Sequence, residues 1–92
     1  MNKNYMKILN LSNESIKNLL ISFEKKFQIE QMNPENLTRQ IFENIKPDIV
    51  ITSVISKRLL NWKEKFFTKL IKVFDSPENL SIEPYVDDFI IL

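Results

Sequence analysis

The residues best placed to do chemistry are four cations in a segment whose periodicity predicts one helix over residues 56–74: Arg58, Lys65, Lys69 and Lys72. At about 100° per residue these cations share one side of that helix. Cations that neutralise phosphates and rings that stack on bases are the means by which many proteins hold nucleic acid. The nearby rings of Trp62 and Phe66, however, fall on the opposite, apolar side, and the net charge is only +1. Nucleic-acid binding through the four cations is therefore the alternative function.

Three residue types that support most catalysis are missing, because the chain has no Cys, no His and no Gly. Their absence removes thiolate nucleophiles, imidazole acid–base chemistry, ordinary zinc ligation and the Gly-rich loops that cradle phosphates. We therefore expect a protein that is not an enzyme and has no cofactor and no metal. Ala is also missing, and Ile, Lys and Asn are abundant, as an AT-rich genome would dictate. Because of this bias, the number of lysines is weaker evidence for any function.

The acidic residues gather at the end of the chain. Residues 49–75 carry six bases and two acids, whereas residues 76–92 carry four acids and no base. Asp87 and Asp88 are adjacent, and neighbours in a strand point to opposite faces, so they do not form a metal site with Glu83. A basic segment followed by an acidic one predicts attraction between the two, within one chain or between two chains.

The apolar side of the predicted 56–74 helix is wider than the roughly 100° stripe that a surface helix needs. One explanation is that part of it contacts another subunit or protein, and the other is that it lies beneath the C-terminal strand. Contact with another subunit or protein predicts an interaction surface of four apolar residues with a rim of three lysines. The apolar residues are Trp62, Phe66, Phe67 and Leu70, and the lysines are Lys65, Lys69 and Lys72.

Strand and helix signals alternate along the chain. We expect a short strand in residues 5–11, a helix over about 13–26 capped by Ser12, and either a strand or a frayed helix end at 27–32. Asn33 and Pro34 mark the start of a second helix, which Pro47 ends. The β-branched run 48–55 predicts a buried strand, the 56–74 helix follows, and the last four residues form a strand.

This order predicts an α/β fold, with a small parallel sheet of three or four strands and three helices, in a single domain over residues 1–92. The alternative is an all-α helical bundle in which residues 48–74 form one long helix.

The segments MKILNLSNE and IKPDIVITSVI resemble the first and third strands of receiver domains of two-component signalling, and the resemblance covers residues 6–55. It implies a flavodoxin-like fold. Receivers hold magnesium with two acids after the first strand and accept phosphate on an aspartate after the third. The matching positions here hold Ser12, Asn13 and Ser53. The resemblance therefore implies a truncated, degenerate pseudo-receiver that has kept the scaffold and lost the switch.

No stretch approaches the ~20 apolar residues that cross a bilayer, and the N-terminus has no signal-peptide pattern. We expect a location in the cytoplasm or an organellar interior, without a membrane. With little catalytic equipment and a wide apolar side, the sequence predicts a non-enzymatic protein–protein interaction module. Its partner is either itself, giving a homo-oligomer, or another protein in a larger assembly.

Overall fold

The computed structural model describes residues 6–23, 27–81 and 83–92, and its centre is a parallel β-sheet. Its strands are β1 (Met6–Asn10), β2 (Phe27–Gln31), β3 (Ile49–Thr52), β4 (Lys69–Phe74) and β5 (Asp88–Ile91). The connecting α-helices are α1 (Glu14–Phe23), α2 (Arg39–Ile45) and α3 (Lys57–Phe66), with 3-10 turns η1 (Pro34–Asn36) and η2 (Pro77–Asn79). Among the described residues, no helix is both long and apolar enough to span a bilayer.

The strands lie in the order β2-β1-β3-β4-β5, and every neighbouring pair is parallel. This is the strand order of doubly wound, flavodoxin-like sheets, in which the direction of winding reverses between β1 and β3. The predicted α/β fold with three helices is confirmed, with five strands in place of three or four. The all-α alternative is wrong, because residues 49–52 form a strand in the middle of the sheet.

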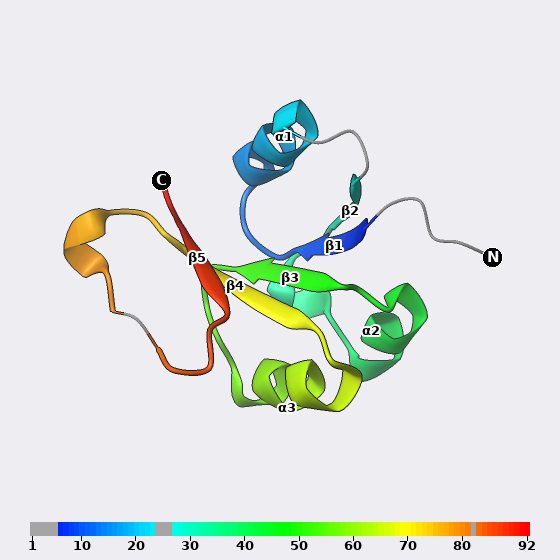
Figure 1. The fold of residues 1–92 in the computed structure, drawn as a ribbon. Helices are drawn as coiled ribbons and strands as arrows, with labels where there is room; N and C mark the ends of the chain where they lie inside the picture. The colour runs from blue at the N-terminus through cyan, green and yellow to red at the C-terminus, as the bar shows by residue number, and fades with distance from the viewer. Residues whose placement is uncertain (1–5, 24–26, 82) are drawn as a thin grey trace.

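Helices cover the two faces of the sheet unequally, with α1 on one face and α2 and α3 on the other (Figure 1). Successive strand residues point to opposite faces, so a strand can contribute side chains to two cores, one on each face of the sheet. The core under α2 and α3 contains Leu9, Leu11, Leu37, Phe42, Val50, Leu59 and Leu70. The core on the α1 face contains Ile8, Ile16, Ile51 and Val73.

Short polar side chains start the helices, as the sequence indicates, but not always at the expected residue. α1 begins after Asn13, whose Oδ1 accepts a hydrogen bond from the Ser15 amide, so the expected cap at Ser12 is one position too early. Asn33 does cap Pro34–Asn36, but that segment is only a 3-10 turn. Thr38 caps α2 itself. Residues 24–26, at the expected end of the first helix, lie outside the described residues.

The single helix expected over residues 56–74 is wrong. Ser56 caps α3 as its Oγ accepts from the Leu59 amide, but the helix stops at Phe66, and residues 69–74 form β4. The apolar residues after Phe66 therefore do not extend an amphipathic helix. Leu70 and Val73, for example, point into opposite cores of the sheet. The apolar side of the predicted helix is unusually wide because the prediction combines residues of two elements, α3 and β4.

Ion pairs within the chain hold the crossover from β4 to β5, and they confirm the predicted attraction between the basic and acidic segments. Lys63 Nζ lies 3.2 Å from Asp87 Oδ2, and Lys72 Nζ lies 3.1 Å from Glu83 Oε1. Asp87 Oδ2 also accepts a hydrogen bond of 2.8 Å from the Leu70 amide. Partial burial raises the pKa of Asp87, but the Leu70 amide and Lys63 outweigh it, so this pKa lies below its ordinary value.

Candidate interaction surface

Phe67 is the most exposed large apolar side chain among the described residues, with 92% of its surface accessible. It follows the last residue of α3 and has a φ angle of 55°, in the left-handed region. That region suits Gly, and a bulky residue there is uncommon and costly. A chain without Gly must place another residue at this turn, but that alone does not explain an aromatic side chain in solvent.

Hydrogen bonds donated by the two residues after Phe67 fix the turn. The amide of Thr68 reaches back to the carbonyl of Lys63 at 3.0 Å, as in a Schellman-type helix end. The buried hydroxyl of Thr68 donates to the Pro47 carbonyl at 3.1 Å, and the Lys69 amide donates to the Asp48 carbonyl at 3.0 Å. The Phe67 ring is therefore presented from a rigid turn tied to the start of β3.

A cleft of about 570 Å³ lies beside this turn, at the amino-terminal edge of the sheet. Its lining combines apolar residues with charges of both signs: Phe42, Pro47, Phe66 and Phe67, with Glu43, Lys46 and Asp48. We call this cleft together with the Phe67 ring the Phe67 surface. Aromatic packing supports it from below, because the Phe42 ring lies 5.4 Å from the Trp62 ring and 5.6 Å from the Phe66 ring.

The predicted interaction residues differ in exposure, because some lie at the surface and others in the core. Phe67 is exposed, and Phe66 lines the cleft, whereas Trp62 packs against the core and supports Phe42. Leu70 is only 1% exposed and lies in the core, because it is a strand residue under α3. It is not on the molecular surface, so its expected role in direct contact is wrong.

The predicted cations do not form one stripe. Arg58 and Lys65 are exposed on α3, while Lys69 and Lys72 belong to β4. Arg58 stacks on the Trp62 ring and donates to the Pro34 carbonyl. Lys72 is 17% exposed and is paired with Glu83. The four cations therefore lie on two elements in different surroundings.

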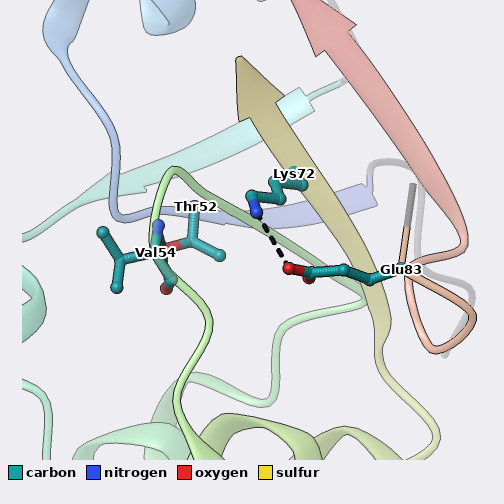
Figure 2. A network of polar contacts seen from close by, with 4 residues as sticks. All are labelled: Thr52, Val54, Lys72 and Glu83. Atoms are coloured by element: carbon teal, nitrogen blue, oxygen red, sulfur yellow. Dashed lines mark hydrogen bonds and ion pairs between the residues drawn. The ribbon is translucent and has the colours of Figure 1, made fainter. Parts of the chain in front are cut away.

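Polar groups at the carboxyl-terminal edge of the sheet, where doubly wound folds bind ligands, are largely engaged with one another. The Thr52 hydroxyl donates to the Val54 carbonyl and accepts from the Val54 amide, and Lys72 reaches Glu83 nearby (Figure 2). Glu83 Oε2 is buried with no hydrogen-bond partner among the described residues. No group of three or more Asp or Glu side chains that could hold a metal ion occurs in the described part of the chain.

Hydrogen bonds between polar groups also fix the turn after β1. The Asn10 side chain is fully buried and holds Gln31 and the Ser12 amide, while the Gln31 amide group donates to the Ser12 carbonyl. Ser53 is exposed at the end of β3. Ser12 and Asn13 follow β1 and Ser53 follows β3, so these three residues lie at the carboxyl-terminal edge of the sheet, where the Ser12 backbone and the Asn13 side chain take part in the hydrogen bonds of the turn.

Sequence reasoning missed the residues that complete the cleft, Glu43, Lys46, Pro47 and Asp48, because they come from the end of α2 and the start of β3. Only the position of the helix end after Phe66 brings them next to Phe67. No protein-family model, no curated protein and no solved structure significantly matches the chain.

Proposed function

We propose that this chain is a non-enzymatic protein–protein interaction module, which binds through the Phe67 surface and either self-associates or joins a larger assembly. The observation that carries the proposal is the Phe67 ring, 92% exposed on a hydrogen-bonded turn beside a cleft with apolar and charged walls. Exposed aromatic residues next to a hollow are typical anchors of protein interfaces, where burial of one ring contributes much of the binding energy. The exposed Lys65 and Lys69 lie close to Phe67 in the sequence and belong to the proposed contact, beside the charged residues of the cleft itself, Glu43, Lys46 and Asp48.

Two observations support a binding role rather than catalysis: the composition of the chain and the position of the cleft. The chain has no Cys, His or Gly. The cleft lies at the amino-terminal edge of the sheet, opposite the edge where doubly wound enzymes place their ligands. We also propose a location in the cytoplasm or an organellar interior, and a scaffold of pseudo-receiver type. An acyl-phosphate donor with magnesium should then leave the mass of the protein unchanged, and a phosphate adduct would contradict the loss of the switch.

A photo-crosslinking experiment tests the proposed surface. A photoreactive phenylalanine analogue is placed at position 67 in cells of the source organism, and a matched control carries it at Lys57, which is exposed at the other end of α3. We expect discrete crosslinked polypeptides from position 67 and few from position 57. Equal labelling at the two positions, or none at position 67, would refute the interaction surface.

Nucleic-acid binding through Arg58, Lys65, Lys69 and Lys72 stays the alternative hypothesis. The division of these cations between α3 and β4 and the pairing of Lys72 with Glu83 weigh against it. Salt distinguishes the two functions, because affinity for nucleic acid falls steeply as salt rises, whereas an apolar interface responds little.

A further inference from the structure

The Phe67 surface contains both a projection and a hollow. The Phe67 ring borders the cleft but is 92% exposed, so it does not fill the cleft of its own chain. The remaining apolar wall is made by Phe42, Pro47 and Phe66. Phe42 and Pro47 are buried and form its floor, so the half-buried Phe66 is the part of this wall that an aromatic or aliphatic side chain from outside would contact most. Resting on the proposed function, we propose that the partner is a second copy of this chain, with Phe67 of each copy entering the cleft of the other.

Two-fold symmetry requires a surface that is complementary to itself, because the same patch faces its own copy. The Phe67 surface meets this requirement in shape, since a projecting ring stands next to a hollow. It also meets it in charge. Glu43 and Asp48 line the cleft together with Lys46, so its rim carries both signs. Glu43 also pairs with Arg39, and Asp48 Oδ2 accepts a hydrogen bond from the Lys7 amide, so each acid would face Lys46 of the other copy in addition to its partner within the chain. A rim of one sign would instead favour an oppositely charged partner, such as nucleic acid or an acidic peptide.

The expected size of the contact sets the expected affinity. Each Phe side chain buries roughly 150–250 Å² when it enters a pocket. Two exchanged rings and their rims fall below the roughly 1,200–2,000 Å² of a standard stable interface. The dimer should therefore be weak and concentration-dependent, with a dissociation constant on the order of micromolar.

The test is sedimentation equilibrium of the full chain over a concentration series, with two variants that damage opposite halves of the contact. Phe67→Ala removes the ring and leaves the cleft open. Glu43→Trp fills the cleft and keeps the ring, but it also removes the 3.0 Å ion pair between Arg39 and Glu43. Arg39→Ala removes the same ion pair without entering the cleft and is the matched control. Circular dichroism confirms that every variant is folded.

We expect the wild-type mass to rise from 11.0 kDa toward twice that value with concentration, and Arg39→Ala to behave alike. Phe67→Ala and Glu43→Trp should each weaken association at least tenfold. An equimolar mixture of the two should associate more tightly than either variant alone, because the ring of one enters the open cleft of the other.

A wild-type chain that stays monomeric, a Phe67→Ala chain that associates like wild type, or a mixture no tighter than its components would overturn the exchange. These outcomes are separate from a failure of the proposed function. A monomeric chain that still crosslinks to a different polypeptide from position 67 would keep the interaction surface and exclude the second copy as its partner.

Discussion

Replacing Phe67 with Gly should make the isolated chain more stable while removing the ring that we assign to binding. A non-Gly residue in the left-handed region costs roughly 1–2 kcal/mol, whereas Gly adds about 0.5–1 kcal/mol of backbone entropy to the unfolded chain. The ring offsets little of this, because it is 92% exposed at φ 55°. The net expectation is a gain in the free energy of unfolding of roughly 0.5–1 kcal/mol, equivalent to a Tm increase of about 2–8 °C.

The assay is thermal and urea unfolding followed by circular dichroism, at concentrations below the range where the chain associates, because dimerisation would stabilise the wild type by mass action. Phe67→Ala is the matched control, since it removes the ring but keeps a Cβ in the left-handed conformation. Its stability should stay within about 0.5 kcal/mol of wild type. Loss of more than about 1 kcal/mol in both variants would mean that the ring packs against its own chain, contrary to its exposure.

Three further outcomes test the packing and charges around β4. Leu70→Ala should lower the free energy of unfolding by about 2–5 kcal/mol in urea titrations, as for a core residue, and a loss below 1 kcal/mol would argue for a surface position. Because the pKa of Asp87 is lowered, its contribution holds above the ordinary pKa and fades as pH falls through the lowered value. Below roughly pH 4 the urea midpoint of wild type should therefore approach that of Asp87→Asn, and a constant gap would contradict this. A double-mutant cycle on Lys72 and Glu83, 17% and 26% exposed, should give a larger coupling energy than the roughly 0.3–0.5 kcal/mol of an exposed helix pair.

The sheet could be predicted because its signals are local. The β-branched run around Val50 and Ile51 favours a buried strand between two helical layers, and Pro47 separates it from the helix before it. The charge pattern also gave a correct result, because oppositely charged segments on neighbouring elements pair within the chain. Lys63 and Asp87, which are far apart in sequence, meet for that reason.

The end of α3 could not be predicted, and the reason is chemical. Gly usually marks the left-handed residue that ends a helix, and this chain has none. Its left-handed residues among those described are Lys46 and Phe67. Pro47 signals the end of α2, but no such residue follows Phe67 to signal the end of α3, so the apolar residues of β4 fit the pattern of a continued helix. The sequence accordingly placed both residues on one surface, whereas Phe67 is exposed and Leu70 is buried in the core.

The end of α3 at Phe66, which no Gly or Pro marks in the sequence, also creates the candidate surface. A continuous helix through residue 74 would have kept residue 67 on a regular helical flank, and the ends of α2 and α3 would not have met at one edge of the sheet. Meanwhile the acids Glu83 and Asp87 are taken up by Lys72 and Lys63 within the chain, so long-range attraction between those segments is weakened as a source of association. The main contribution to the proposed association is then apolar burial around Phe67, with the charged rim of the cleft as a smaller one, which predicts association that persists at high salt and weakens on cooling.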